Sequence, residues 1–259
     1  MRSSLRVWFT KEFQYESSTT YRMVNKVDRM REYDLAAKGA PLAPRLASNG
    51  PGAVFDSLNE DEILRILDWV VFTNSSAYGG KEKNAALEKI LSAGGSAWRV
   101  GERDGSPGLE RRVPSGVADA AEAAMKVPGD AGRLLSEAWA ATYGVNPQPD
   151  LGYRKSIEAV EAVVLPLVTK NDSTATLGKA IGQMRAHGDW KLPFIKEHQQ
   201  NPSEGVVLGM LQALWSGHSD RHPGTPNYVL STQAAAEAAV SLAVTLVNLF
   251  SNGGIARRP

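Results

Sequence analysis

The chain has 259 residues, which is enough for one large domain or two smaller ones. Its composition, 42% hydrophobic and 22% charged, is typical of a folded globular protein and excludes wholesale disorder. A formal net charge of +1 excludes a protein whose bulk positive field captures nucleic acid. Any contact with RNA or DNA must therefore be local.

Cysteine is absent, which excludes disulfides and thiolate chemistry and is consistent with a reducing cytoplasm. The first residues, MRSSLRVWFTKEF, carry scattered charges in place of the basic end and apolar run of a secretory signal. The most apolar stretch, residues 234–250, contains Glu237 and Asn248 and falls short of the roughly 20 apolar residues that a bilayer span needs. We therefore expect a cytoplasmic protein without a membrane segment.

Apolar residues recur at helical spacing through much of the N-terminal part. The stripe over Tyr21–Val27 predicts an amphipathic helix that fades near Gly39. Residues 39–53, GAPLAPRLASNGPGA, combine proline and glycine in a way that predicts a long surface loop or linker.

The next predicted helix begins at Asn59, because Glu62 stands three positions later and the first turn is acidic. A further helix over residues 87–91 is expected to end at Gly94–Gly95. The apolar positions expected in the core of the first of these two helices are Ile63, Leu67 and Val70.

Residues 96–113 predict a small β-hairpin, because SAWRV and LERRV flank a loop with glycine, aspartate and proline. The hairpin carries Arg99, Arg111 and Arg112 beside a tryptophan. Basic and aromatic side chains interleaved in this way are candidates for RNA contact. A solvated hairpin face is the alternative.

Two short helices follow, with Ser115 and Asp130 as predicted N-caps. The segment GVNPQPD, residues 144–150, then combines two prolines with polar residues and is the predicted internal boundary. We therefore divide the chain into a helical N-terminal region with the hairpin, 1–145, and a helical bundle, 146–259.

The second part shows four amphipathic stripes, which are typical of a helical bundle. Ser203 and Ser231 stand at the expected N-cap positions, and Gly253 follows the last stripe as a stop signal. The expected fold class is mainly α. The predicted spans are 151–168, 174–187, 203–215 and 231–251.

The chain has four histidines, all in its last third, and two of them fall in the connection before the last predicted helix. The segment SGHSDRHPGT holds His218, Asp220, Arg221 and His222 within five positions. For metal-free RNA cleavage, His222 or His218 can take the proton from the ribose 2′-hydroxyl. Arg221 can neutralise the charge that develops on the phosphate.

Two other interpretations of this segment stay open. In the first, Asp220 closes a turn, Arg221 pairs with a carboxylate, and both histidines are solvated or bond to loop backbone. In the second, His218 and His222 bind a metal ion with Asp220, although the flanking glycine and proline disfavour a helix that carries both histidines. We expect no cofactor and no metal.

Four stretches of the second part resemble, in order and spacing, the C-terminal helical domain of bacterial abortive-infection proteins of the HEPN superfamily. They are YRKSIEAVEAVVLPLV, TATLGKAIGQM, MLQALWSGHSDRHPG and AAAEAAVSLAVTLVNLF, and they cover roughly 150–253. The piece DRHPG is similar to that family's DRHG signature with a proline inserted. The resemblance implies a four- or five-helix up-and-down bundle that forms a homodimer, with a polar loop before the last helix near the twofold axis.

Many members of that superfamily are metal-independent endoribonucleases that act as toxins or antiphage effectors, and others are inactive binding modules. The resemblance implies RNA as substrate, an antitoxin or phage-defence partner, His222 as general acid/base and Arg221 as the phosphate-stabilising cation. His218 and Asp220 would orient or assist. The alternative is an inactive module that binds a partner protein, a nucleotide or RNA. In active members an arginine precedes the catalytic histidine by four to six residues, whereas residues 216–218 hold none.

Overall fold

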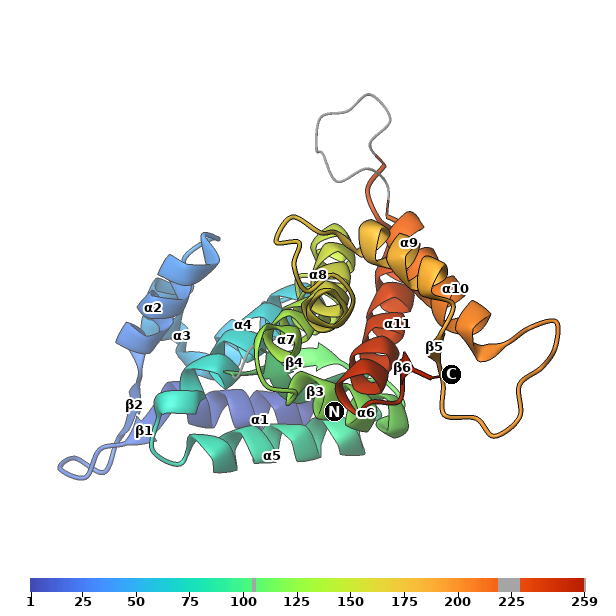
Figure 1. The fold of residues 1–259 in the computed structure, drawn as a ribbon. Helices are drawn as coiled ribbons and strands as arrows, with labels where there is room; N and C mark the ends of the chain where they lie inside the picture. Colours follow the sequence, from blue (N-terminus) through green and yellow to red (C-terminus); the bar gives the residue numbers. More distant parts are fainter. Residues whose placement is uncertain (104–105, 219–228, 259) are drawn as a thin grey trace. The chain divides into compact units, whose positions relative to one another are not determined.

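The computed structural model describes residues 1–103, 106–218 and 229–258. The described residues form eleven α-helices and three small antiparallel strand pairs, so the mainly helical class predicted from the sequence is confirmed (Figure 1). The chain divides into two compact units, Met1–Arg112 and Val113–Pro259. Each unit is described by itself below.

The first unit begins with α1 (Arg2–Phe13), a helix that the sequence pattern did not predict. Phe9 and Phe13 are fully buried, and their ring centroids lie 4.7 Å apart. Phe9 also packs on Phe55 at a centroid distance of 5.4 Å. These aromatic contacts join α1 to the kinked helix α3 described below and form part of the core of this unit.

A short hairpin follows α1 and separates it from α2 (Val27–Ala37). Its strands are β1 (Gln14–Glu16) and β2 (Met23–Asn25). The helix predicted from Tyr21 onward is therefore wrong over its first residues. Two local features explain the difference: Tyr21 has a left-handed φ of 50°, and Val24 pairs across the hairpin with Tyr15.

The loop predicted for residues 39–53 is also wrong in most of its length, because α3 spans Ala43–Asp56. Pro44 lies in the first turn of α3. The backbone N–H groups of a first turn have no partner within the helix, so a proline, which lacks this N–H, is tolerated there. Gly50, with φ 76° and ψ 171°, breaks the helix in two, and Pro51 then opens the second segment. Proline and glycine thus set a kink here instead of excluding a helix.

The helix α4 (Glu60–Thr73) confirms the predicted start at Asn59. The Asn59 side chain accepts from the Glu62 backbone N–H, and the Glu62 side chain accepts from the Asn59 N–H, which is a complete capping box. The three apolar positions expected in its core, Ile63, Leu67 and Val70, are buried.

The rest of the first unit consists of a short 3₁₀ turn, a helix and a hairpin. These elements are η1 (Asn74–Ser76), α5 (Gly80–Ala93), β3 (Trp98–Arg103) and β4 (Ser106–Arg111). The hairpin expected at 96–113 is therefore confirmed, with six paired positions from Trp98↔Arg111 to Arg103↔Ser106.

The second unit contains all four helices predicted from the apolar stripes, preceded by the two predicted short helices. They are α6 (Ser115–Met125), α7 (Asp130–Tyr143), α8 (Pro149–Val168), α9 (Leu177–His187), α10 (Ser203–Ser216) and α11 (Gln233–Ser251). A two-residue strand pair, β5 (Trp190–Lys191) with β6 (Ala256–Arg257), ties the end of the described chain to the segment after α9.

The predicted N-caps of the second unit are each wrong by one position. Ser115, Asp130 and Ser203 are the first residues of their helices, because Pro114, Gly129 and Pro202 hold the non-helical cap positions. Thr232, and not Ser231, caps α11 and accepts from the Ala235 N–H. Ser231 has another partner, which is described with the site.

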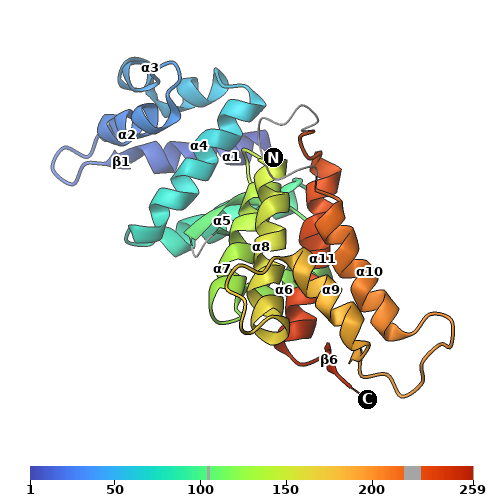
Figure 2. The same ribbon diagram turned by 45° about the horizontal axis from the view of Figure 1, so that its top comes forward.

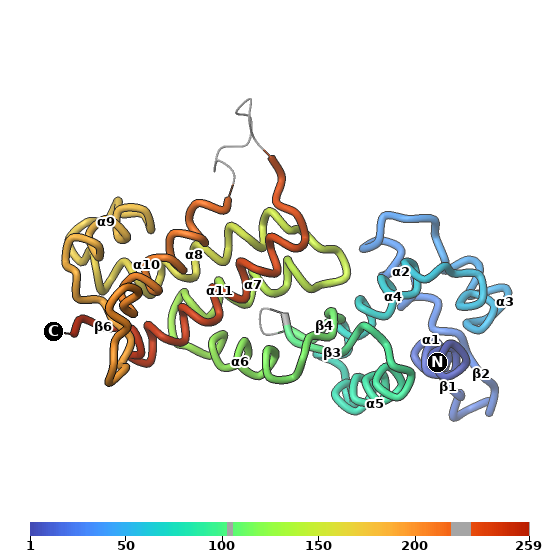
Figure 3. The backbone as a smooth tube through the Cα atoms, turned by 90° about the vertical axis from the view of Figure 1, so that its right-hand side faces the viewer, coloured from blue at the N-terminus to red at the C-terminus, as the bar shows by residue number. Residues whose placement is uncertain are grey.

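The core of the second unit is shared by all six helices. Figures 2 and 3 show α7, α8 and α11 side by side, and buried residues of each lie in one continuous cluster. Ala121 on α6 and Leu135 on α7 belong to this cluster together with residues of the four predicted helices. The structure therefore shows a helical assembly, and a specific HEPN-like bundle stays a prediction.

The segment 144–150, predicted as a boundary, connects α7 to α8 inside the second unit. A Cβ at Gly152 would collide with the Thr142 hydroxyl, so the two helices approach closely at this point. The compact units divide earlier, between Arg112 and Val113.

Among the described residues, α11 is the one helix whose length and composition would allow it to cross a bilayer. Its apolar residues pack on α8, α7 and α6, with Val240, Ala243 and Val247 fully buried. This packing agrees with the buried helix expected for residues 234–250.

Candidate functional site

Three of the four predicted catalytic residues, Asp220, Arg221 and His222, lie outside the described residues. His218 and Val229 are the described residues on either side of that segment. The candidate site is therefore built from the helix ends that flank residues 219–228, and the roles of those three residues stay predictions.

His218 follows the end of α10 and packs into the protein instead of facing solvent. Its side chain is only 4% exposed, and Nε2 lies 3.7 Å from Oδ1 of Asp150. Its ring centroid is 5.2 Å from that of Tyr153. The imidazole thus lies between an aromatic ring and a carboxylate, both of α8, and this packing sets its orientation.

Tyr153 fixes the end of α10 in two ways. Its hydroxyl donates to the carbonyl oxygen of Leu214 at 3.1 Å. A Cβ at Gly217 would collide with the same hydroxyl, which explains a glycine at the residue before His218. Burial raises the pKa of Tyr153 above its ordinary value. The phenol therefore stays protonated at neutral pH and acts as a hydrogen-bond donor.

Asp150 lies in the first turn of α8, where the helix dipole favours a carboxylate. Its Oδ1 accepts from the backbone N–H of Ser231 at 3.2 Å and from the Ser231 hydroxyl at 3.1 Å. The same oxygen faces His218. One carboxylate oxygen therefore joins the residue before segment 219–228 to a residue just after it.

A pocket of about 420 Å³ opens beside Asp150. Arg154, one helical turn after Asp150, lines it, and its side chain is 53% exposed. The ion pair of Arg154 with Glu158 is loose, at 3.7 Å. The guanidinium is therefore available to an anion in the pocket. The other lining residues are Gln148, Pro149, Leu151, Leu230 and Ser231.

The sequence patterns did not identify Asp150, Tyr153 and Arg154 as site residues. The only local signal was an aspartate and an arginine four positions apart at the start of a predicted helix, which places them on one face. Their meeting with His218 depends on packing between helices more than 60 residues apart in the chain.

The three arginines predicted to touch RNA lie on the β3–β4 hairpin of the first unit. Arg99 is within 2.6 Å of Glu110, a carboxylate that is almost completely buried. Arg112 pairs with Glu88 at 2.8 Å and also donates to two backbone carbonyls. Arg111 lies over the Trp98 ring at 5.7 Å. The RNA contact of these residues stays a prediction.

The other two histidines do not join His218. His187, at the end of α9, accepts from the Trp190 indole at 3.2 Å. His198 accepts from the backbone N–H groups of Gln200 and Asn201. Within the residues that the structure describes, no group of three His, Asp or Glu side chains is arranged to hold a metal ion.

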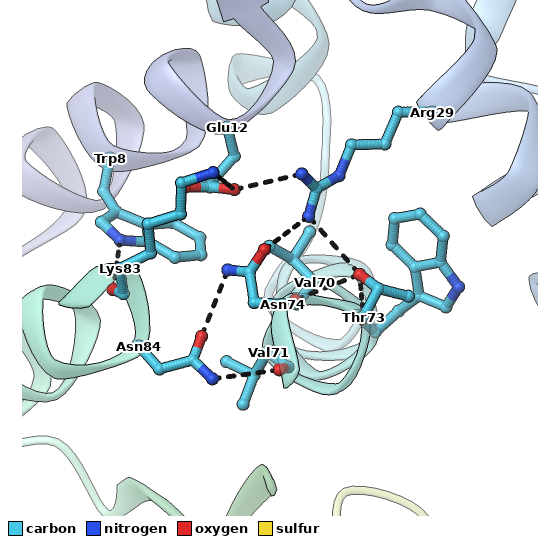
Figure 4. Close-up of polar contacts among 10 residues, drawn as sticks. Trp8, Glu12, Arg29, Val70, Val71, Thr73, Asn74, Lys83 and Asn84 are labelled. Carbon is cyan, nitrogen blue, oxygen red and sulfur yellow. Dashed lines mark hydrogen bonds and ion pairs between the residues drawn. The ribbon is translucent and has the colours of Figure 1, made fainter. Parts of the chain in front are cut away.

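A second polar cluster lies in the first unit and joins α1, α2, η1 and α5 (Figure 4). The Glu12 side chain is 3% exposed, and its Oε2 lies 3.4 Å from Arg29 Nη1 and 3.5 Å from Lys83 Nζ. Arg29 donates to the Asn74 side chain at 2.8 Å, and Asn74 donates to Asn84 at 3.2 Å. No sequence pattern indicated a buried carboxylate at this position.

Comparison with known proteins adds no family to these observations. No protein-family model, curated protein or solved structure matches the chain. The resemblance to HEPN abortive-infection domains therefore rests on the four sequence stretches alone.

Proposed function

We propose that the second unit is a metal-independent endoribonuclease of the abortive-infection type, which cleaves RNA with residues of the segment between α10 and α11. The observation that carries the proposal is the contact of Asp150 with both His218 and Ser231. Reactive groups are often placed on loops whose ends are fixed by a rigid scaffold. Asp150 supplies such an anchor beside an open pocket.

The proposed reaction needs one proton-transfer group and one cation. His222 takes the proton from the ribose 2′-hydroxyl, and the 2′-oxygen attacks the adjacent phosphorus. The bond from phosphorus to the 5′-oxygen breaks, and His222 returns the proton to that oxygen. Arg221 neutralises the charge on the phosphate oxygens during the attack. The products are a 2′,3′-cyclic phosphate and a free 5′-hydroxyl.

Arg154 supports the proposal as a second phosphate-binding cation. Residues 216–218 lack the arginine that active relatives carry before the histidine. Arg154 lines the pocket beside Asp150 and offers a half-exposed guanidinium at the same place. Its fork of donors suits phosphate oxygens. His218 and Asp150 orient the segment in this scheme, and Asp220 assists.

The biological setting belongs to the same proposal. The protein acts in the cytoplasm as a homodimer, limits growth during phage infection, and is restrained by an antitoxin or another phage-defence partner. These features are what the resemblance to the HEPN superfamily implies.

One observation favours the second candidate, an inactive module that binds a partner protein, a nucleotide or RNA. The His218 side chain is 4% exposed and packs between Tyr153 and Asp150. An imidazole in that position serves structure instead of reaching a substrate. In that case the pocket beside Arg154 is a binding site without chemistry.

The test is incubation of the purified full chain with total RNA in the presence of EDTA. The endoribonuclease produces fragments with 2′,3′-cyclic phosphate ends, and His222→Ala and Arg221→Ala remove them. His198→Ala is the matched control, because it removes an imidazole from another part of the unit and leaves cleavage intact. RNA that stays intact with the wild-type chain favours the binding module.

A further inference from the structure

The β1–β2 hairpin of the first unit displays aromatic side chains to solvent. Tyr21 is 80% exposed and Tyr15 is 49% exposed, and Met23 beside them is also exposed. The hairpin is fixed at its base, where Lys26 N–H donates to the Phe13 carbonyl at 2.8 Å. A two-stranded hairpin buries little surface by itself. Its large exposed side chains therefore contribute little to folding.

Tyr21 adopts a backbone conformation that costs free energy. Its φ of 50° lies in the left-handed region, which is unfavourable for a bulky residue other than glycine by about 1–2 kcal/mol. The turn keeps this geometry through Tyr21 N–H to the Ser17 carbonyl, at 2.8 Å, and Ser17 N–H to the Arg22 carbonyl, at 2.9 Å. Glycine would adopt this backbone conformation at lower cost. The presence of tyrosine at this strained position therefore suggests a function for its side chain.

Positive charge collects at the base of the hairpin. Lys26 directly follows β2, and Arg29 and Lys83 flank the buried carboxylate of Glu12 (Figure 4). Burial lowers the pKa of Lys26, and the charges of Lys83 and Arg29 lower it further, against the opposing effect of Glu12. Glu12 therefore interacts with three cations. Glu16 on β1 and Asp28 on α2 are exposed carboxylates in the same part of the chain, and Asp28 is paired with Arg31, so the local excess of positive charge is small.

Arg22 adds a cation to the hairpin itself. Its side chain is exposed and makes no ion pair or hydrogen bond within the part of the chain that the structure describes. This differs from Arg99 and Arg112 on the β3–β4 hairpin, which already have carboxylate partners. Tyr15 on β1 pairs with Val24, two residues before Lys26, and Tyr21 and Arg22 directly precede β2. The rings and the cations thus lie within the reach of a few nucleotides.

We propose that this hairpin surface, made of Tyr15, Tyr21, Arg22 and Lys26, binds single-stranded RNA. Bases stack on the two tyrosine rings while Arg22 and Lys26 contact phosphates, the combination that binds single strands without sequence preference. The first unit has seventeen Lys and Arg against fifteen Asp and Glu, so the attraction is local and not a bulk field. The choice of RNA over other anions rests on the proposed function, because RNA is the substrate proposed for the second unit.

The test measures binding of a fluorescein-labelled 12-nucleotide oligo(U) to the full chain by fluorescence anisotropy. All proteins carry His222→Ala, so that cleavage does not consume the probe. Tyr21→Gly is the main variant, because glycine relieves the left-handed backbone and removes only the ring. We expect Tyr21→Gly and Tyr15→Ser each to weaken binding roughly fivefold or more. Tyr78→Ser is the matched control, since Tyr78 is a fully exposed tyrosine elsewhere in the same unit.

Salt dependence tests the cations separately. Lys26→Met is expected to weaken binding and to reduce the slope of log affinity against log salt by about 1, as the loss of one phosphate contact does. Lys89→Met, which removes an exposed lysine from α5, leaves the slope unchanged. Binding that is the same in Tyr21→Gly, Tyr15→Ser and Tyr78→Ser overturns the proposal. The proposal is also overturned if the chain binds poly-glutamate through the same tyrosines and does not bind oligo(U).

The two proposals fail in different ways. If the wild-type chain cleaves RNA and the tyrosine variants bind oligo(U) normally, the hairpin proposal fails and the endoribonuclease stands. If the tyrosine variants lose binding and the wild-type chain leaves RNA intact, the hairpin proposal stands and the endoribonuclease fails.

Discussion

Oδ1 of Asp150 lies 3.7 Å from Nε2 of His218 and accepts two hydrogen bonds from Ser231. The sequence singled out His218 from its neighbours in the chain, but the structure adds the carboxylate that holds it. A single oxygen at the start of α8 thus contacts a described residue on each side of residues 219–228.

We predict that Asp150→Ala impairs the site more than Asp150→Asn does. Asparagine keeps an acceptor for Ser231 and loses the charge facing His218, whereas alanine loses both. Because hydrogen bonds to a charged acceptor contribute about 1.5–3 kcal/mol, Asp150→Ala should lower the free energy of unfolding by about that amount. The proposed RNA cleavage should fall about tenfold or more. Urea unfolding and initial cleavage rates measure the two effects.

The control for Asp150 is Asp119→Ala, which removes an exposed carboxylate from α6. It should leave both the unfolding and the cleavage rate near the wild-type values, because exposed substitutions away from special features have small effects. Equal behaviour of Asp150→Ala and Asp119→Ala would contradict the anchoring role.

A second prediction concerns the buried carboxylate of the first unit. Glu12→Gln should lower the free energy of unfolding by about 1–3 kcal/mol, because it leaves the partly exposed cations Arg29 and Lys83 without their buried counter-charge. Chemical denaturation followed by tryptophan fluorescence measures the change. Glu82→Gln, an exposed position on α5, is the matched control.

A double-mutant cycle makes this prediction sharper. Adding Lys83→Met to Glu12→Gln should recover part of the lost stability, since it removes one of the unpaired cations. A sum of the two single effects without any recovery would show that Glu12 and Lys83 do not interact energetically.

The helices of the second unit were predictable from sequence because their apolar residues repeat at the helical period and are buried on one side. Val160 of α8 and Val247 of α11, for example, lie on the predicted stripes and are fully buried. Asn59 and Glu62 likewise formed the capping box that their spacing indicated. The rule that failed was to treat proline and glycine as loop formers, because α3 accommodates both Pro44 and Gly50.

Only His218 of the described site residues was predictable, because it lies in a short segment of the chain that is rich in reactive residue types. Asp150, Tyr153 and Arg154 stand more than 60 residues earlier, and their meeting with His218 depends on how α8 packs against α10 and the residues before α11. Sequence periodicity indicates which face of a helix is buried, but it does not indicate which other helix covers that face. The residues of α8 that contact His218 and Ser231 can therefore be identified only once the packing of the helices is known.

A third prediction compares the same substitution at two glycines. A Cβ at Gly80 would collide with the backbone carbonyl of Asn74, whereas a Cβ at Gly182 on α9 meets open space. Gly80→Ala should lower the free energy of unfolding by about 1–3 kcal/mol, as overpacking does. Gly182→Ala should raise it by up to about 1 kcal/mol, because alanine favours the helix. Denaturant unfolding of the two variants should therefore give opposite signs.

The last prediction concerns acid stability. Glu137 on α7 lies 2.9 Å from Lys155 Nζ on α8, and this hydrogen bond is the main reason that the pKa of Glu137 is lowered below its ordinary 4.5. A carboxylate with a lowered pKa in the folded state contributes stability that is fully present above about pH 4.5 and is lost as the pH falls through its folded pKa. The pair is partly exposed, so its contribution is about 0.5 kcal/mol.

Glu137→Gln should therefore be less stable than the wild type at pH 7 by about that amount, and the difference should shrink below about pH 4.5. Thermal unfolding at a series of pH values from 7 to 3 measures this convergence. Asp119→Asn is the control for a general loss of one negative charge, and its difference from wild type should stay near zero. A Glu137→Gln difference that is the same at every pH would mean that the amide disturbs packing between α7 and α8 and that the ion pair contributes nothing.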